Sequence, residues 1–397
     1  SSTRGWLRDG ERRIAERGPA GHARPGTAAA LRVLIATDRL SLRGGADQHL
    51  LDVIVALRDQ GVAVTVACGR TEPDAIPEGV AVHRVRALAR MVANTRQLDR
   101  LTPLLVDADV VHVQNVMNPT ALSRLTASGR AVVTIQDHRV FCPGPGKTLP
   151  DDAPCKQLMS EATCATCLPE PGYRAQLLAL TEARRAALLG ARLVVLSDYM
   201  AAELAAVGLP GAAVIPPWVD LPTGPPQSGD GFLMGGRLVA HKGIQRALKA
   251  WQEADTAMPL HVAGAGPLSE TLAGSTALSW LSRAALLEVM AASRALLFPS
   301  RWQEPFGILG LQALSVGTPV ILFPSGGTRD WSAAGCVLVG SVPEMSEAIT
   351  ALSADPARAA ALGRAGQAAV LSRFSRAALL PELLAVYSSV AAKHRIV

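Results

Sequence analysis

Short, almost uninterrupted apolar runs recur along the chain, and helix-length segments separate them. In the first half, such runs lie at residues 31–37, 62–67, 110–113, 132–135 and 193–196. A strand that is apolar on both faces is typical of a parallel sheet covered by helices on both sides. The alternation of strand and helix therefore predicts an α/β fold built on a parallel sheet.

A second series of the same kind starts after residue 231, so two Rossmann-like parallel-sheet domains are expected. The chain has 397 residues, of which 49% are hydrophobic and 18% charged, enough for two buried cores. The predicted order is a partly disordered N-terminal extension (1–30), a first domain (31–215), a Pro/Gly-rich linker (216–231), a second domain (232–374) and a C-terminal helix (375–397). Helices of the first domain are expected at 46–60, 95–105, 174–189 and 200–207.

Charge and hydropathy argue against two classes of protein. The net charge is +6, but half of it comes from residues 1–30, and no aromatic residues interleave with the basic ones, so nucleic-acid binding is not expected. The first thirty residues contain no apolar core of a secretory signal, and no run reaches the ~18 apolar residues of a membrane-spanning helix. We therefore expect a cytoplasmic protein. Peripheral membrane contact through the Arg-rich first segment stays open.

Two glycines, Gly44 and Gly45, follow the first predicted strand and open the first predicted helix. Glycine lets a ligand approach the backbone closely, and a helix N-terminus offers free N–H groups and a positive dipole end. This arrangement suits a phosphate group, although a Gly-rich turn between strand and helix is often only a turn.

Two cations, Arg237 and Lys242, flank the end of the first strand of the second series. An arginine fork and a lysine point charge together can hold a diphosphate. The alternative is two surface cations at a helix start, a place where the helix dipole disfavours positive charge.

The most specific pattern is the segment 299–320, where a strand ends at Pro299, a loop presents Glu304 and a helix begins near Gly307. Backbone N–H groups at Ile308 and Leu309 would face a phosphate there. Gln312 would lie about one turn into the same helix.

In this order, the segments resemble the retaining GT-B glycosyltransferases of family GT4. The resemblance runs from about residue 31 to the C-terminus and includes the Gly-Gly-Ala loop, the Gly-Arg-Leu and Lys-Gly pair, the Gly264-Ala265-Gly266-Pro267 turn and the Glu-Pro-Phe-Gly segment. It implies a nucleotide-sugar donor, commonly a UDP-, GDP- or ADP-sugar, and no metal cofactor for catalysis. It also implies a final helix that crosses back onto the first domain, in a monomer or homodimer.

The resemblance further implies which residues bind the donor. Arg237 and Lys242 would hold the diphosphate, Glu304 would contact the donor sugar, and the amides of Ile308 and Leu309 would face phosphate. Gln312 would contact the ribose. The remaining implied donor-site residues are Gly44, Gly45, Gly264, Gly266, Phe306 and Gly307.

Two positions depart from the family pattern. Gln312 stands where relatives have Glu, and Gln136 stands where relatives commonly have a His before Asp137. An amide cannot take a proton, so either His138 acts in its place or the reaction proceeds without a side-chain base. A thiolate or another anionic acceptor would need no base. Asp137, His138 and Glu304 are the candidate catalytic residues, and Gln136, Arg139 and Lys147 are the candidate acceptor contacts.

Four of the six cysteines lie in the long loop 138–172: Cys142, Cys155, Cys164 and Cys167. Cys164 and Cys167 have the C-x2-C spacing of many zinc sites, and clustered cysteines in a cytoplasmic protein favour a metal over disulfides. A structural zinc ion is therefore one prediction. Free thiols, disulfides or an Fe–S cluster are the alternatives.

The leading functional hypothesis is transfer of a sugar from a nucleotide-sugar, most simply a UDP- or GDP-sugar, to a small-molecule or lipid-linked acceptor. A non-catalytic GT-B binding partner is a second reading, since positions 136 and 312 have lost ionisable groups. A phosphorylase or epimerase on the same fold is a third. The Ala- and Arg-rich composition is typical of a GC-rich genome, in which such enzymes often serve secondary metabolism.

Overall fold

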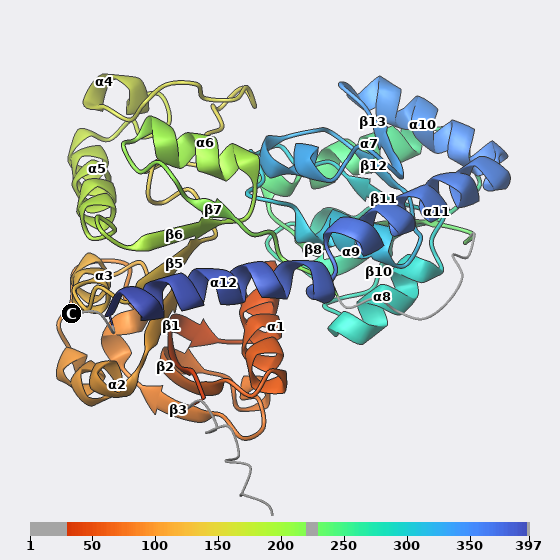
Figure 1. Ribbon diagram of the computed structural model, residues 1–397. Coiled ribbons are helices and arrows are strands. Elements are labelled where there is room, and N and C mark those ends of the chain that lie inside the picture. The colour runs from red at the N-terminus through yellow and green to blue at the C-terminus, as the bar shows by residue number, and fades with distance from the viewer. Residues whose placement is uncertain (1–29, 220–228, 395–397) are drawn as a thin grey trace, which may run out of the picture. The chain divides into compact units, whose positions relative to one another are not determined.

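The computed structural model describes residues 30–219 and 229–394, and it contains two parallel β-sheets (Figure 1). The first sheet has seven strands in the order β3-β2-β1-β4-β5-β6-β7. Their bounds are β1 Arg32–Leu40, β2 Ala63–Thr71, β3 Ala81–Arg84, β4 Val110–Gln114, β5 Ala131–Ile135, β6 Arg192–Val195 and β7 Ala213–Val214. β4 and β5 are buried at every residue, as expected for central strands covered on both faces.

The second sheet repeats this architecture with six strands, in the order β10-β9-β8-β11-β12-β13. Their bounds are β8 Phe232–Arg237, β9 Leu260–Ala265, β10 Thr276–Ala277, β11 Ala295–Phe298, β12 Val320–Leu322 and β13 Cys336–Leu338. Every pair of neighbouring strands in both sheets is parallel. The predicted α/β fold with two Rossmann-like sheets is thus confirmed.

Helices connect the strands. Those of the first half are α1 Gly45–Asp59, α2 Leu101–Asp107, α3 Pro119–Thr126, α4 Glu161–Cys164, α5 Pro171–Ala186 and α6 Asp198–Ala206. Those of the second half are α7 Ile244–Glu253, α8 Arg283–Ala291, α9 Ile308–Ser315, α10 Val342–Ala354, α11 Pro356–Arg373 and α12 Arg376–His394. Six short 3-10 turns complete the described elements: Pro73–Ala75, Arg86–Ala89, Leu98–Arg100, Ala240–Lys242, Ser269–Thr271 and Gly326–Asp330.

The strand order reverses direction once in each sheet, between β1 and β4 and again between β8 and β11. In open α/β sheets, ligands bind beyond the carboxyl ends of the strands at such a reversal. The topology therefore predicts a ligand site after β1 and β4 in one sheet and after β8 and β11 in the other.

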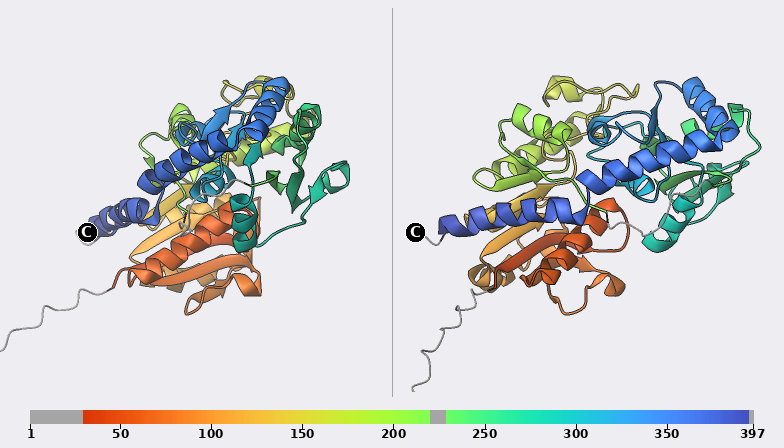
Figure 2. Two further views of the ribbon diagram at one scale, coloured as in Figure 1. Left: turned by 90° about the vertical axis from the view of Figure 1, so that its right-hand side faces the viewer. Right: turned by 45° about the vertical axis from the view of Figure 1, so that its right-hand side comes forward.

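The last helix, α12, returns to the first sheet (Figures 1 and 2). The chain passes between the two domains twice, once after β7 and once before α12. The two passages lie side by side, since Val219 N donates to Phe374 O at 3.1 Å. Beyond that point, Arg376 pairs with Asp59 at 2.7 Å, and the Tyr387 hydroxyl is hydrogen-bonded to His112 Nδ1 at 2.6 Å.

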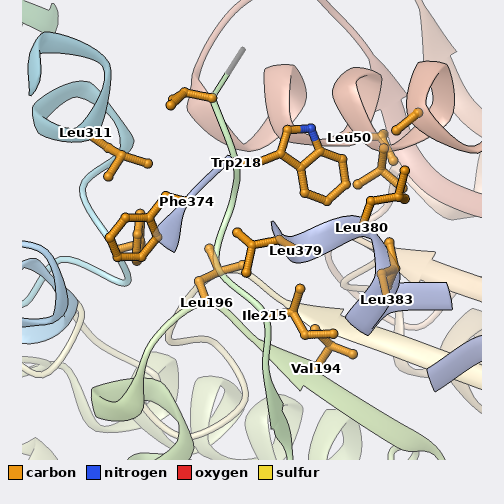
Figure 3. Packing of buried hydrophobic residues seen from close by; sticks show 14 of the residues in the cluster. Leu50, Val194, Leu196, Ile215, Trp218, Leu311, Phe374, Leu379, Leu380 and Leu383 are labelled. Carbon is orange, nitrogen blue, oxygen red and sulfur yellow. The ribbon is translucent and has the colours of Figure 1, made fainter. Parts of the chain in front are cut away.

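The apolar face of α12 fills a core that continues through the crossing (Figure 3). Leu379, Leu380 and Leu383 pack in one cluster with Leu50 of α1 and with Trp218, which is 2% exposed. Because the same cluster contains Leu311 of α9, α12 and the crossing segment share one buried core with both sheets.

Some predictions differ from the structure or fall outside it. The helix expected at 95–105 begins later, as a 3-10 turn at Leu98 followed by α2, and the two-residue strand β10 was not predicted. Most of the predicted extension 1–30 and residues 220–228 of the predicted linker lie outside the described residues. In the described part, no helix is both long enough and apolar enough to span a membrane.

Candidate functional site

A cavity of about 270 Å³ lies beyond the carboxyl ends of strands from both sheets, among them β1, β8 and β11 at the two reversals of strand order. Twelve predicted site residues line it: Gly44, Gly45, Gln136, Arg237, Lys242, Gly264, Glu304, Phe306, Gly307, Ile308, Leu309 and Gln312. These residues are up to 268 positions apart in sequence (312 − 44), so the fold brings them together.

The helix α9 begins at the cavity with its first amides uncapped. Gly307 precedes it with φ +86°, a left-handed conformation that favours glycine, and no side chain caps the helix. Trp331 holds this start in place: its Nε1 donates to Phe306 O at 2.6 Å, and a Cβ on Gly310 would lie 2.1 Å from its ring. The N–H groups of Ile308 and Leu309 are thus placed to face an anion.

Glu304 lies on the loop between β11 and α9 and is 4% exposed. Its Oε1 accepts hydrogen bonds from Lys242 Nζ at 2.7 Å and from Ser300 Oγ at 2.6 Å. Burial works to raise the pKa of Glu304, but Lys242 and the hydrogen bonds outweigh burial and hold the pKa below its ordinary value. Glu304 is therefore a charged carboxylate at neutral pH.

The two predicted cations lie at the end of β8 and just before α7. Arg237 is the last residue of β8, and Lys242 ends a 3-10 turn whose cap, Gly243, has φ +73°. A Cβ on Gly243 would lie 1.9 Å from Pro299 O, so only glycine permits this close approach to the end of β11. That approach brings Lys242 beside the loop that carries Glu304.

The first domain supplies the opposite wall. Gly44 has φ +94°, and a Cβ on Gly45 would lie 3.1 Å from the Ile308 side chain, so the glycine loop lies directly against the start of α9. Gln136, just after β5, is 8% exposed, and neither polar atom of its amide has a hydrogen-bond partner in the described part of the chain. A buried amide without partners at a cavity wall is suited to bind a polar ligand.

Five predicted residues do not reach the cavity wall: Asp137, His138, Arg139, Lys147 and Gly266. Asp137 accepts hydrogen bonds from Arg139, whose Nε lies 2.8 Å from Oδ2. Lys147 is 5% exposed and reaches away to Gln157 O at 2.8 Å and Glu203 at 3.1 Å. Gly266 packs against the backbone of Leu238, where a Cβ would lie 2.5 Å from the carbonyl oxygen.

His138 is buried in the loop after β5 instead of facing the cavity. The chain turns sharply here, since the amides of Phe141 and Cys142 both donate to His138 O, at 2.8 and 2.7 Å. The turn directs the imidazole against Trp302, with ring centroids 5.2 Å apart. Burial lowers the pKa of His138 to about 4, so the ring is neutral at pH 7.

The four clustered cysteines surround a second cavity, of only about 20 Å³, and all are free thiols. Cys142 Sγ accepts from Lys147 N at 3.3 Å, while the thiols of Cys155 and Cys167 point to backbone carbonyls at 3.9 Å. Across residues 30–219 and 229–394, no group of three or more His, Cys, Asp or Glu side chains is arranged to hold a metal ion. The predicted zinc site at Cys142, Cys155, Cys164 and Cys167 is therefore not supported, and neither are disulfides between them.

Several cavity residues were missed by the sequence analysis, notably Trp280, Arg283, Ser300 and Gln48. Trp280 follows β10, a strand too short to give a periodic signal. Ser300 could have been found from its place between a predicted strand end and Glu304. Arg283 pairs with Asp52 of α1 at 2.6 Å, a contact that no local pattern indicates.

Two opposed Rossmann-like sheets with a cavity at their carboxyl ends define the GT-B class of glycosyltransferase folds. Two family models match successive parts of the chain: "Glycosyltransferase Family 4" over residues 43–222 and "Glycosyl transferases group 1" over residues 223–369. The chain belongs to glycosyltransferase family 4, as the sequence motifs indicated.

Curated relatives match only part of the chain. A GDP-mannose-dependent monoacylated alpha-(1-6)-phosphatidylinositol monomannoside mannosyltransferase of Corynebacterium glutamicum is 33% identical over 159 residues, which is 35% of this chain and 42% of that protein. An alpha-maltose-1-phosphate synthase of Mycobacterium tuberculosis is 32% identical over 117 residues, 27% of this chain and 30% of that protein. The matches thus span less than half the length of these relatives.

Solved structures share the fold over most of the chain. HepE of Anabaena, solved in complex with UDP-glucose, superposes with a TM-score of 0.66 at 16% identity, covering 90% of this chain and 100% of that one. AviGT4, a glycosyltransferase involved in avilamycin A biosynthesis, superposes with a TM-score of 0.60 at 16% identity, covering 91% and 98%. At this identity the likeness concerns the fold alone.

Proposed function

We propose that this protein is a retaining glycosyltransferase that moves a sugar from a nucleotide-sugar to a small-molecule or lipid-linked acceptor. The observation that carries the proposal is the composition of one cavity. Arg237, Lys242, the carboxylate of Glu304 and the uncapped start of α9 line it together. Cations and helix N–H groups suit a diphosphate, and a buried carboxylate suits sugar hydroxyls.

Each donor residue has a proposed role. Arg237 and Lys242 neutralise the diphosphate, and the amides of Ile308 and Leu309 donate to it. Glu304 accepts hydrogen bonds from the donor sugar. Gln312, which is 8% exposed, contacts the ribose through its neutral amide. Since Lys242 is bound to Glu304 in the free protein, donor binding would transfer part of this contact to phosphate.

The acceptor side lacks an obvious base, because no histidine occurs among the described residues that line the cavity. In the proposed reaction, the bond from the anomeric carbon to the diphosphate oxygen breaks and the bond to the acceptor forms on the same face. The acceptor proton passes to the leaving phosphate oxygen. An acceptor that is already anionic, such as a thiolate, would carry no proton to remove.

The names of two similar proteins point to two possible nucleotides in the donor, GDP and UDP. The mannosyltransferase of Corynebacterium glutamicum is named as GDP-mannose-dependent and acts on a phosphatidylinositol monomannoside, while HepE was solved with UDP-glucose. GDP and UDP are therefore the first nucleotides to test, and a lipid-linked acceptor is among the first acceptors.

A thermal-shift screen tests the donor. UDP-, GDP-, ADP- and dTDP-sugars are added to the protein at about 100 times the dissociation constant, where a true ligand stabilises the fold by about 2.7 kcal/mol. We expect one nucleotide class to raise the melting temperature. Arg237→Ala and Lys242→Ala should abolish the shift, whereas Lys249→Ala, an exposed lysine on α7, should keep it.

Product analysis separates the proposal from its alternatives. Transfer of the sugar with its anomeric configuration kept supports the proposed function. A thermal shift without turnover would identify a non-catalytic binding partner, for which the loss of ionisable groups at Gln136 and Gln312 is the specific argument. Release of a sugar phosphate or an epimerised sugar would indicate a phosphorylase or an epimerase. No shift with any nucleotide-sugar would contradict the proposal.

A further inference from the structure

We infer that Asp152, in the cysteine-containing loop of the first domain, positions the segment of the second domain that carries Glu304. The inference rests on the proposed function, because it assigns Asp152 to the donor-sugar side of that site. Asp152 does not line the cavity. It acts through the backbone of residues 301–304 and is a positioning residue.

A tight hairpin presents Asp152. Thr148 and Pro154 form an antiparallel bridge, Cys155 N donates to Lys147 O at 2.8 Å, and Leu149 N donates to Ala153 O at 2.8 Å. At its tip, Asp152 has φ +71°, a left-handed conformation that aspartate and asparagine tolerate better than most residues. The hairpin therefore fixes where the carboxylate points.

That carboxylate binds two arginines of the second domain. Arg301 Nε donates to both carboxylate oxygens at 2.7 Å, and Arg301 Nη2 makes a further contact with Oδ1. Arg246 Nη2 of α7 donates to Oδ2 at 2.5 Å. The Asp152 side chain is only 20% exposed, so water screens these ion pairs less than it would at an open surface. Asp152 thus links Arg301 to Arg246 of helix α7.

The contact continues along the chain toward Glu304. The amide of Gln303 donates to Thr148 Oγ1 of the hairpin at 3.1 Å. Trp302, between Arg301 and Gln303 in sequence, packs on the same loop: a Cβ on Gly146 would lie 2.6 Å from the Trp302 ring. Residues 301, 302 and 303 each touch residues 146–152, so the hairpin contacts every residue of the stretch that leads into Glu304.

In the described part of the chain, the hydrogen-bond partners of Glu304 lie in its own domain: Lys242 and Ser300 donate to the carboxylate, and Gly327 N donates to the carbonyl oxygen at 2.8 Å. The hairpin therefore acts on Glu304 through the backbone of residues 301–303, which precede it. Loosening the hairpin contact would move Glu304 relative to a bound sugar. Of the residues proposed to bind phosphate, Lys242 is linked to this stretch through Glu304 and Trp302. In the described part of the chain, Arg237, Ile308 and Leu309 have no hydrogen bond or ion pair to residues 146–152, so the nucleotide part of the donor should be affected less than the sugar.

The test compares Asp152→Asn with Asp151→Asn. Asparagine retains the tolerance for positive φ and removes the charge. Asp151 is the matched control: it is the exposed neighbour in the same turn, and its carboxylate accepts a hydrogen bond from Ala153 N of its own loop at 3.1 Å. Dissociation constants are measured for the nucleoside diphosphate and for the nucleotide-sugar, together with kcat and KM.

We expect Asp152→Asn to lower kcat between about tenfold and a hundredfold, because a displacement near 1 Å at a reacting centre costs that much. The affinity for the nucleoside diphosphate should fall less than the affinity for the nucleotide-sugar, because Lys242 is one of several proposed phosphate contacts and the others are not bonded to the hairpin in the described residues. Asp151→Asn should resemble the wild type. Equal losses for the diphosphate and the nucleotide-sugar would show general destabilisation and overturn the inference, as would unchanged kinetics.

A second measurement separates this inference from the proposed function. If the wild type binds no nucleotide-sugar, hydrogen–deuterium exchange of the Gln303 amide in the free protein still decides the structural claim. Asp152→Asn should accelerate that exchange relative to Asp151→Asn, because the hairpin no longer holds Arg301. Equal exchange in the two variants would overturn the inference even in an active enzyme.

Discussion

Two charged side chains at the cavity, Lys242 and Glu304, pair with each other in the free protein. Lys242 Nζ lies 2.7 Å from Glu304 and also 5.2 Å from the centre of the Trp302 ring. A buried carboxylate without such a partner would be costly, since removing a charge from water requires compensation. Under the proposed function, Glu304 is therefore already paired before the donor binds.

At the scale of one residue, the prediction concerns the side-chain amide of Gln136. Gln136→His places an imidazole on a wall that has no histidine among its described residues. With a hydroxyl acceptor, we expect transfer to rise, by up to ~10²-fold if the ring removes the acceptor proton. The rate with the native acceptor should change little. Initial rates with a series of hydroxyl acceptors check this.

A matched variant, Gln48→His, adds an imidazole elsewhere on the same wall, on α1. It should not raise the transfer rate. A rise in both variants would mean that position 136 has no special relation to the acceptor. An unchanged transfer rate in both variants would contradict the hypothesis that glutamine at position 136 reflects an acceptor that needs no base.

At the scale of elements, the best-defined contact of α12 is a buried chain of hydrogen bonds. His112 of β4 is hydrogen-bonded to Tyr387 at 2.6 Å and, through Nε2, to Thr134 of β5 at 2.8 Å. His112 is 1% exposed and Tyr387 is fully buried. The chain of hydrogen bonds therefore ties the helix to two central strands of the first sheet.

Tyr387→Phe tests this connection. Removing the hydroxyl leaves His112 Nδ1 buried without a partner, so the free energy of unfolding should fall by about 1–3 kcal/mol. Urea unfolding followed by circular dichroism measures the loss. Ser388→Ala, at an exposed neighbouring position on α12, should change the free energy by less than about 0.5 kcal/mol. Equal effects of the two variants would mean that the hydrogen bond to His112 contributes little.

At the scale of the whole molecule, stability should depend on pH because three histidines are buried without charge. Burial lowers the pKa of His49 to about 4, of His112 to about 3 and of His138 to about 4. Unfolding restores pKa values near 6.5, so the unfolded chain binds more protons between pH 6.5 and 4. Each histidine then lowers the free energy of unfolding as the pH falls through that window.

Asp47 acts in the opposite direction. Burial raises its pKa to about 6, against the pull of Arg39. Its folded form binds a proton that the unfolded chain releases, so its contribution is present below about pH 4 and is lost as the pH rises through 6. Three histidines against one aspartate leave a net loss of stability on acidification.

We therefore expect the free energy of unfolding to fall by roughly 3 kcal/mol per pH unit between pH 6 and 4, at about 1.4 kcal/mol for each group. Urea unfolding at several pH values measures the slope. His49→Phe should reduce the slope by about half, and His83→Gln, at an exposed position, should leave it unchanged. A flat profile would contradict the buried neutral state of these rings.

Local patterns were enough for the fold and for the second-domain half of the site. Continuous apolar strands predicted both sheets. Arg237, Lys242, Glu304 and Gln312 line the cavity because each lies at a strand end, in the loop that follows one, or within the first turns of the next helix. His138 differs: a turn after β5, with two amides bonded to one carbonyl, decides where its ring points. Sequence spacing contains no information about that direction.

Contacts between loops that are distant in sequence could not be predicted from local patterns either. Asp152 and Arg301 are 149 positions apart, and nothing near either residue indicates the other. The four cysteines illustrate the opposite error. Their spacing resembled a metal site, but each thiol whose contacts are known lies against backbone groups of its own loop.

The return of α12 to the first sheet has a consequence for synthesis on the ribosome. The first sheet is complete in sequence at residue 214, yet the helix that supplies Tyr387 and the leucines of its core begins at Arg376. At ~5–20 residues per second, about 8 to 30 s separate the two. During that time the nascent first domain exposes the apolar surface that α12 later covers. Early binding of a chaperone to this surface, and release only at chain termination, would follow from the order of the chain.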